Sequence, residues 1–366
     1  MIVYAALGAV AISFGICFLA VPLYSRVAVR IGMMDVPARH KAHNKPVPLL
    51  GGCAIFAGIA VPSLLALALA RVWSATSIPA WLPGQLASHV GGAAAKAPMA
   101  LGVLGGALVL HVLGIVDDRR NLGAWTKLVV QVVICTAVVV FCNVRVLTLA
   151  GAPISVVLSV LWLVAITNAF NFLDNMDGLA VGVAVICAAA LLGASAGAGQ
   201  VFVSAWLCLV IGAGLGFLPC SLPPASSFMG DAGSLVIGYF LGILSVLTTY
   251  VRPDSPLGAY GLFVPLVVMA VPIYDMMSVI VLRVRERVNP MAGDRRHFSH
   301  RLLRRGMSVR KAVLTVYLCT AATAIGATLL PHVPSDAAAV LVLVQTVLVV
   351  LIIAMLESGD ARASAK

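Results

Sequence analysis

The sequence predicts an all-α protein that crosses a membrane many times. Of its 366 residues, 61% are hydrophobic and only 10% are charged, and the mean hydropathy is +1.08. A soluble globular domain has about 45–50% apolar and about 25% charged residues. The composition therefore excludes a water-soluble enzyme, a disordered chain and a secreted disulfide scaffold. Because little sequence is left for a soluble domain, we expect residues 1–366 to form one integral-membrane domain.

Eleven apolar runs are long enough to span a bilayer, which takes roughly 20 residues. In chain order they are Val3–Leu23, Leu49–Ala70, Met99–Val116, Ala124–Phe141, Ile154–Thr167, Leu179–Ala196, Val201–Leu218, Ser234–Tyr250, Tyr260–Leu282, Ala312–Leu330 and Ala337–Leu356. The fifth run is short, and its helix can extend into the segment after it. The first run lacks a positive n-region and exceeds the length of a signal-peptide h-region, so we interpret it as a retained helix.

Basic residues gather in alternate loops. The odd-numbered loops and the C-terminal tail hold 20 of the 24 Lys and Arg residues, and the even-numbered loops hold only Arg71, Lys96, Arg145 and Arg252. Short cytoplasmic loops carry such an excess. We therefore expect the odd loops and the C-terminus inside and the N-terminus outside, in an inner (plasma) membrane. The net charge of +11 reflects this bias and attraction to anionic headgroups, and it does not indicate nucleic-acid binding.

The eight cysteines lie in or beside apolar runs, without a CxxC pair or a Cys/His cluster. A buried cysteine behaves as a small hydrophobic residue. We interpret all eight as packing residues and expect no zinc or disulfide framework.

The first acidic cluster is Asp117-Asp118, which ends the third run and is followed by two arginines. Adjacent carboxylates repel unless a cation or a shared proton compensates. Lys127 begins the fourth run, and a hairpin would bring it back beside the acids. The pattern suits a proton-accepting or metal-facing pair with a phosphate-binding lysine; the alternative is an ordinary Asp-capped turn.

The second cluster contains Asn168, Asn171, Asp174 and Asp177, which recur every three residues. In a helix this spacing predicts a slowly rotating polar stripe on one face. Amide and carboxylate oxygens suit Mg²⁺, and the amides can also bind a polar substrate group. The alternative is an interfacial helix end that bends at Gly178.

The third cluster places Asp231 between two glycines, followed by Ser234, at the start of the eighth run. Backbone N–H groups at a helix N-terminus and a nearby carboxylate can together hold a divalent cation and a diphosphate. The alternative is a plain N-cap.

Two basic loops complete the candidate residues. The ninth loop contains His297, His300 and Arg301, and the first loop contains Lys41. Arginine and histidine suit phosphate recognition, although either loop could simply bind lipid headgroups. Asp275 follows Pro272 in the ninth run, where an acid is either functional or paired internally.

Taken together, these motifs resemble those of the polyprenyl-phosphate N-acetylhexosamine-1-phosphate transferases (glycosyltransferase family 4). The matching blocks run in the family order from Lys41 to His300, within residues 41–300. They are Lys41-Ala-His43-Asn-Lys-Pro46-Val-Pro48 with Gly51-Gly52, Asp117-Asp118 with Lys127, the block from Asn168 to Leu179, Phe228-Met-Gly-Asp231-Ala-Gly-Ser234, and Val271-Pro272-Ile-Tyr-Asp275. One block departs from the family: Ser299 stands where a middle histidine is usual, which leaves the role of that position open.

The resemblance implies that a UDP-N-acetylhexosamine, here UDP-GlcNAc, gives its sugar-1-phosphate to undecaprenyl phosphate and that UMP leaves. This would be the first membrane step of a cell-surface polysaccharide. The resemblance implies that Asp231, with Asn171, holds Mg²⁺ (or Mn²⁺) and that Asp117 or Asp118 acts on the lipid phosphate. It implies that the substrate phosphates are bound by Lys127, His297, His300, Arg301 and Lys41. It also implies that the nucleotide–sugar pocket is shaped by Asn168, Asp174 and Asp177. We favour Asp117 over Asp118, and direct attack over a covalent intermediate; a homodimer is left open.

Three alternatives were weighed. A phospho-N-acetylmuramoyl-pentapeptide transferase has a run of three histidines that this chain lacks. A secondary transporter would place coupling acids near the bilayer midplane within internal repeats, whereas these acids lie at one edge. A CDP-alcohol phosphotransferase would need an arginine that does not follow Asp177-Gly178-Leu179-Ala180.

Overall fold

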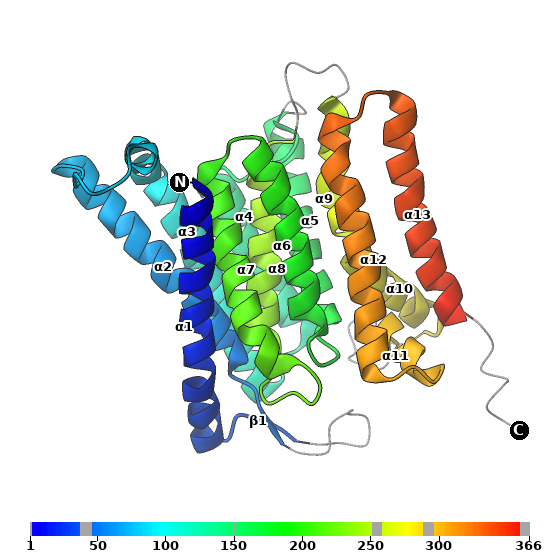
Figure 1. The fold of residues 1–366 in the computed structure, drawn as a ribbon. Coiled ribbons are helices and arrows are strands. Elements are labelled where there is room, and N and C mark those ends of the chain that lie inside the picture. Colours follow the sequence, from blue (N-terminus) through cyan, green and yellow to red (C-terminus); the bar gives the residue numbers. More distant parts are fainter. Residues whose placement is uncertain (1, 37–45, 149–150, 251–257, 288–295, 359–366) are drawn as a thin grey trace, which may run out of the picture.

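The computed structural model describes residues 2–36, 46–148, 151–250, 258–287 and 296–358 (Figure 1). Nearly all of them are helical. The helices are α1 (Ile2–Ile31), α2 (Gly51–Ala75), α3 (Gly84–Arg120), α4 (Ala124–Phe141), α5 (Ala152–Leu173), α6 (Leu179–Gly197), α7 (Val201–Ser221), α8 (Gly230–Leu247), α9 (Val264–Val268), α10 (Ala270–Arg285), α11 (Phe298–Arg304), α12 (Val309–Leu329) and α13 (Asp336–Ser358). Two 3₁₀ segments, η2 (Gly258–Phe263) and η3 (Leu330–His332), and a two-stranded antiparallel ladder of β1 (Met34–Asp35) and β2 (Val47–Pro48) complete the described part.

The helices confirm the predicted membrane-spanning architecture. Ten are long and apolar enough to cross a bilayer, and a bent pair makes an eleventh. Each predicted run lies in one of them. The start of α1 and the end of α13 lie at opposite ends of the bundle, as an odd number of spans requires (Figure 1).

The ninth run is a bent pair of helices: it turns by 59° between its two halves, where α9 ends at Val268 and α10 starts at Ala270. One local prediction was wrong. The polar stripe from Asn168 to Asp177 was expected on one helix face. Instead α5 ends at Leu173, and Gly178 takes a left-handed φ of +74°, so Asp174 and Asp177 lie in a turn.

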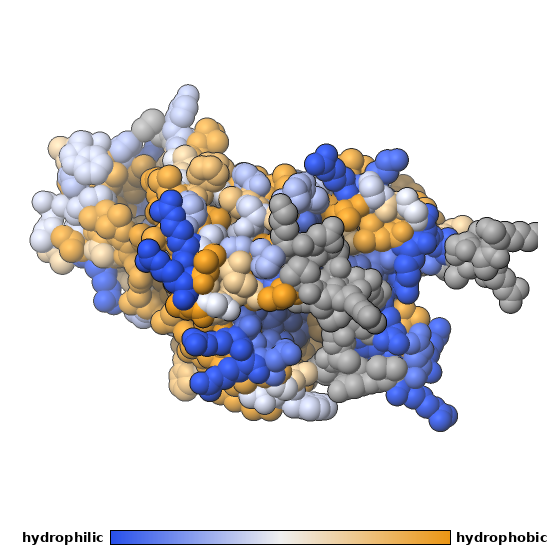
Figure 2. Space-filling model, turned by 90° about the horizontal axis from the view of Figure 1, so that it is seen from below, coloured by the Kyte–Doolittle hydropathy of each residue, from blue (hydrophilic) through white to orange (hydrophobic). Residues whose placement is uncertain are grey.

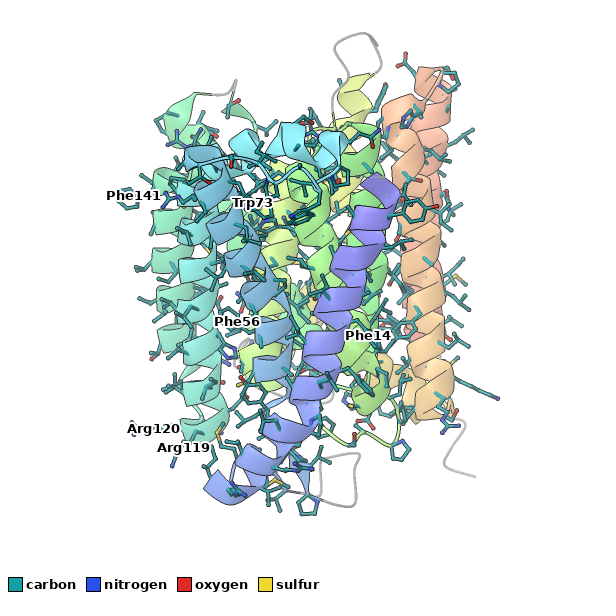
Figure 3. All side chains as sticks on the ribbon, turned by 60° about the vertical axis from the view of Figure 1, so that its left-hand side comes forward. Phe14, Phe56, Trp73, Arg119, Arg120 and Phe141 are labelled. Atoms are coloured by element: carbon teal, nitrogen blue, oxygen red, sulfur yellow. The ribbon has the colours of Figure 1, made fainter. Side chains whose placement is uncertain are left out.

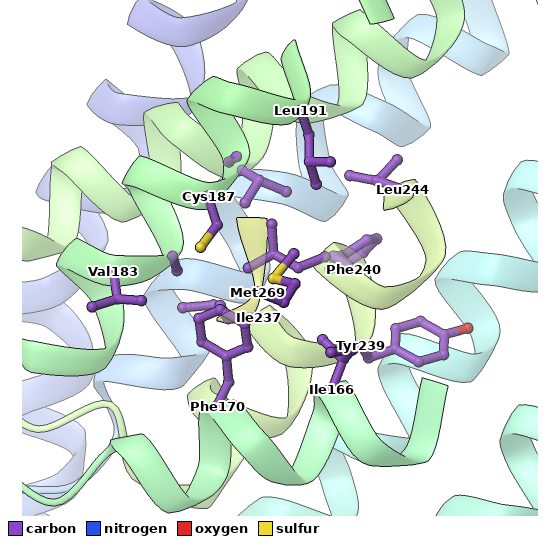
Figure 4. Packing of buried hydrophobic residues seen from close by; sticks show 14 of the residues in the cluster. Ile166, Phe170, Val183, Cys187, Leu191, Ile237, Tyr239, Phe240, Leu244 and Met269 are labelled. Carbon is purple, nitrogen blue, oxygen red and sulfur yellow. The ribbon is translucent and has the colours of Figure 1, made fainter. Parts of the chain in front are cut away.

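The core is built around α8, whose span is 78% buried, whereas the spans of α1 and α13 are only 17% buried. Buried side chains of α5, α6 and α8, among them Phe170, Cys187 and Phe240, pack together (Figure 4). All eight cysteines are unpaired and at least partly buried, which confirms their predicted packing role. Large apolar side chains on the outside, such as Phe141, point away from the bundle (Figure 3), as expected of a surface that faces lipid.

Small residues bring the site-bearing helices close together. In a bilayer, helices associate by van der Waals packing. Glycine at a helix–helix interface therefore favours association more than a large apolar side chain does, because it lets the backbones approach closely. Gly238 of α8 lies against α5, and a Cβ added there would come within 2.8 Å of the Thr167 Cα. This contact fixes the distance between the helices that carry Asp231 and Asn171.

We predict that Gly238→Ala destabilises the protein by about 1–3 kcal/mol, because the added methyl group has no space against the α5 backbone. Gly105→Ala is the matched control, since nothing lies within 4 Å of the Cβ built at Gly105, and it should be neutral or slightly stabilising. Thermal unfolding in detergent, followed by size-exclusion chromatography, measures both. Equal midpoints for the two variants would contradict this packing argument.

Candidate active site

Three helix ends carry the acidic clusters to the same end of the bundle. Asp117 and Asp118 lie in the last turn of α3, Asp174 directly follows α5, and Asp231 is in the first turn of α8. The α3–α4 connection is a tight hairpin in which Asn121 takes a left-handed φ of +53°. Figure 3 shows Arg119 and Arg120 at this same end. The predicted convergence of the acidic clusters is therefore confirmed.

Lys127 links two of these clusters. Its Nζ lies 2.8 Å from Asp117 Oδ2 and 2.7 Å from Asp231 Oδ2. The second oxygen of Asp117 accepts the Leu122 backbone N–H at 2.7 Å. The hairpin prediction is thus confirmed. The lysine pairs with two carboxylates at once, so a phosphate that binds Lys127 must compete with them.

Asp118 has a different task from its neighbour. Its two oxygens accept the backbone N–H groups of Asp231 (2.9 Å) and Ala232 (3.3 Å). A side chain at Gly230 would collide with this carboxylate. We predicted that these N–H groups would face a phosphate; that was wrong, because the Asp118 side chain already satisfies them. Asp118 therefore fixes the start of α8, and Asp117 is the member of the pair held by the lysine.

Asn171 joins the same network from α5. Its Nδ2 donates to Asp231 Oδ1 at 2.9 Å and to Ser234 Oγ at 2.9 Å. Each oxygen of Asp231 therefore has one partner, Asn171 on one side and Lys127 on the other. The buried His111 ring, with Nδ1 2.9 Å from the Ala232 carbonyl oxygen, braces the same turn from α3.

The turn between α5 and α6 adds two further carboxylates. Asp177 Oδ2 accepts the Ala225 backbone N–H at 3.1 Å. Burial, reinforced by the negative charges of Asp231, Asp118 and Asp177, raises the pKa of Asp174 well above its ordinary value. Carboxylates are thus crowded here in the absence of a cation.

Aspartates of all three clusters line one cavity of about 680 Å³, which we call the acidic pocket. Six aspartates line it, together with Arg119 and His300: Asp35, Asp117, Asp118, Asp174, Asp177 and Asp231. Figure 2, which views this end of the molecule, shows hydrophilic residues gathered here. The sequence prediction missed Asp35, which reaches the pocket because β1 pairs with β2 just before α2.

The acidic pocket fits a hard divalent cation by the chemistry of its donors. All of its crowded donors are oxygens, and its negative charge exceeds the positive charge of the described residues that line it. No three Asp, Glu, His or Cys side chains of the described segments converge tightly enough to form a complete metal site. Mg²⁺ prefers such oxygen ligands and usually takes one or two carboxylates plus substrate phosphates.

Five of the predicted site residues that the structure describes do not line the acidic pocket: Lys127, Asn168, Asn171, His297 and Arg301. Lys127 and Asn171 still contact Asp231. Asn168 Nδ2 donates to Gln131 of α4 and to the Val164 carbonyl oxygen, so it joins helices and does not line the cavity. Arg301 pairs with Glu357 at 2.9 Å and donates to Ser278 at 2.7 Å. Lys41 lies outside the described residues.

The histidine motif is held on α11. His297 Nδ1 lies 2.9 Å from Asp275 Oδ2, and the other oxygen of Asp275 accepts the Phe298 N–H at 2.9 Å. Ser299 donates to Asn175 Oδ1 at 2.6 Å, and Asn175 and His300 both line the acidic pocket. The roles left open by the sequence are now explained. Asp275 orients His297 and caps α11, and Ser299 attaches α11 to the α5–α6 turn.

Several known proteins are similar to this chain. Residues 100–249 match the family model of glycosyl transferase family 4. The chain is 33% identical over 305 residues to a probable undecaprenyl-phosphate N-acetylglucosaminyl 1-phosphate transferase of Bacillus subtilis, covering 81% of this chain and 77% of the relative. It is 33% identical over 326 residues to the decaprenyl-phosphate N-acetylglucosaminephosphotransferase of Mycolicibacterium smegmatis (82% and 76% covered). A similar Escherichia coli K12 protein, named undecaprenyl-phosphate alpha-N-acetylglucosaminyl 1-phosphate transferase, is 26% identical over 311 residues (81% and 76% covered).

We predict that Asp174→Asn raises the thermal stability of the ligand-free protein at neutral pH. The pKa of Asp174 is raised by folding, so its contribution to stability is fully present below the unfolded value, about 3.9, and is lost as pH rises through the folded value. We expect the unfolding midpoint in detergent to rise by about 2 °C or more at pH 7, and the difference to shrink on acidification. A lower midpoint for the variant at pH 7 would contradict the proposed crowding.

Proposed function

We propose that this chain, which belongs to glycosyl transferase family 4, transfers N-acetylglucosamine 1-phosphate from UDP-GlcNAc to a polyprenyl phosphate such as undecaprenyl phosphate. The products are the lipid diphosphate sugar and UMP, and the step starts a cell-surface polysaccharide. The observation that carries the proposal is the chain of contacts Asp117–Lys127–Asp231–Asn171, in which Asp117 and Asp231 line the acidic pocket. The relatives named for N-acetylglucosamine phosphate transfer favour this substrate over the muramoyl-pentapeptide alternative.

The reaction joins two anions, so the site must neutralise charge before the phosphates meet. An oxygen of the lipid phosphate attacks the phosphorus that carries the sugar, and the bond from that phosphorus to the bridging oxygen breaks as UMP leaves. Lys127 is placed to bind phosphate oxygens as its carboxylate partners turn to other ligands. Asp117 positions the attacking phosphate and accepts its proton when one is present. We propose direct attack, with no sugar-phosphate bound to the enzyme.

We further propose that Mg²⁺ is the cofactor, with Mn²⁺ as a substitute, and that Asp231 holds it with help from Asn171. When bound, the cation would draw charge from the donor diphosphate and stabilise the leaving phosphate. The crowded carboxylates of the acidic pocket support this proposal, because a cation relieves the repulsion that burial imposes on them. His300 lines the same cavity and is placed to contact substrate phosphates.

We propose an inner-membrane location with the acidic pocket facing the cytoplasm, the N-terminus outside and the C-terminus inside. The acidic pocket lies at the end of the bundle where α3 and α5 finish and α8 begins (Figure 1). The odd loops belong to this end, and together with the C-terminal tail they hold 20 of the 24 basic residues. The positive-inside rule therefore favours the cytoplasm for this end. A nucleotide sugar from the cytoplasm and a lipid phosphate from the bilayer can meet at such an edge. The clustering of the acids at one edge gives the transporter alternative no support.

Replacing Asp231 tests the proposal most simply. We predict that Asp231→Asn lowers UMP release by at least about 100-fold, because the neutral side chain loses its hold on the cation and on Lys127. The assay uses purified protein in detergent with radiolabelled UDP-GlcNAc, undecaprenyl phosphate and Mg²⁺.

The matched control is Asp336→Asn, an aspartate in the first turn of α13 whose neighbour is Tyr260. It should retain wild-type turnover. Membrane insertion and elution as a folded species are checked for both variants. Wild-type turnover in folded Asp231→Asn would remove Asp231 from the cation site.

A further inference from the structure

The last helix is attached to the candidate site through one buried carboxylate. Most of α13 faces outward, since only 17% of its span is buried. Glu357 near its end is an exception, because only 8% of its side chain is exposed. Its Oε1 accepts a hydrogen bond from Tyr274 of α10 at 2.6 Å, and its Oε2 lies 2.9 Å from Arg301 Nη2. Its backbone carbonyl accepts from Arg305 at 3.0 Å.

Arg301 depends on this carboxylate for charge compensation. Its side chain is only 12% exposed, and it also donates to the neutral Ser278 hydroxyl. Within the described residues, the buried Nε of Arg301 has no hydrogen-bond acceptor. A buried guanidinium that loses its only anion must move toward water or find a new partner. Removing Glu357 should therefore displace α11.

Three contacts together fix α11. Asp275 binds its N-terminus, Asn175 binds Ser299, and Glu357 binds Arg301. His300 lies between Ser299 and Arg301 in the sequence and lines the acidic pocket. The first two contacts come from elements next to the pocket, whereas the third comes from a helix that otherwise faces the membrane.

We propose that Glu357 is a positioning residue for the transfer reaction: by holding Arg301, it fixes α11 and keeps His300 directed at the acidic pocket. The inference rests on the proposed function, because its readout is phosphosugar transfer. It assigns α13 a role in catalysis that its exposed, apolar sequence does not suggest. It also assigns Arg301 to α11 placement, in contrast to the phosphate-binding role predicted from the sequence.

The test compares Glu357→Met, Arg301→Met and the double variant with wild type. Each single variant leaves a buried partner without its counterpart, whereas replacing both with apolar side chains of similar length is often neutral. We expect kcat per folded molecule to fall about 10- to 100-fold in each single variant, as for a misplaced catalytic group, with the KM for UDP-GlcNAc changed less than about twofold. The double variant should recover most of the lost kcat.

Glu286→Gln is the matched control, because Glu286 also pairs with an arginine, Arg296, but is 51% exposed. It should behave as wild type. Size-exclusion chromatography gives the folded fraction, so a variant that merely unfolds loses yield and not kcat per folded molecule. If wild type and the Glu286→Gln control were both inactive, the result would contradict the proposed function. It would not bear on the contact between Glu357 and Arg301.

Two results would overturn the proposal. If folded Glu357→Met turns over at the wild-type rate, the contact does not position α11 for catalysis. If the double variant is as inactive as Arg301→Met and shows a raised KM, Arg301 binds substrate directly. A KM for UDP-GlcNAc that falls in Glu357→Met would point the same way, since it would mean that the carboxylate normally withholds the arginine from phosphate.

Discussion

The site depends on one ion-paired lysine. Lys127 of α4 lies between Asp117 of α3 and Asp231 of α8, so a single positive charge holds together carboxylates that would otherwise repel one another. Asn171 extends the contact to α5. Because the same groups suit phosphates and a divalent cation, ligands would replace the interactions that hold these helix ends together.

This arrangement explains why so many aspartates can share one cavity. Asp118 and Asp177 accept backbone N–H groups, Asp117 and Asp231 pair with the lysine, and burial raises the pKa of Asp174. The negative charge is therefore partly compensated by the protein and partly left for ligands to compensate. A glycine-lined contact between α5 and α8 maintains the required distances. Stability and function oppose each other at Asp174, as is common at sites built to receive charge.

Much of the fold and part of the site could be predicted from the sequence. Runs of apolar residues predict the spans, and the hairpin between Asp118 and Lys127 follows from their spacing. The sequence does not predict which side chains pair when they lie far apart along the chain. Nothing near Asp118 in the sequence shows that it caps α8, more than a hundred residues away, or that Arg301 pairs with Glu357. Asn168 belongs to the polar stripe by its spacing, although α5, the helix that carries the stripe, ends at Leu173. Asp35 stands alone in the sequence. Three-dimensional packing sets the positions of both side chains.

The central claim is that separate helix ends form one pocket that holds a divalent cation against a substrate diphosphate. Locating Mn²⁺ by anomalous diffraction in crystals grown with UDP-GlcNAc tests it most directly. The account predicts a single strong peak within coordination distance of an Asp231 carboxylate oxygen and of the diphosphate, with Lys127 turned to the phosphates. A peak at the opposite end of the bundle, or a diphosphate bound away from Asp231, would contradict it.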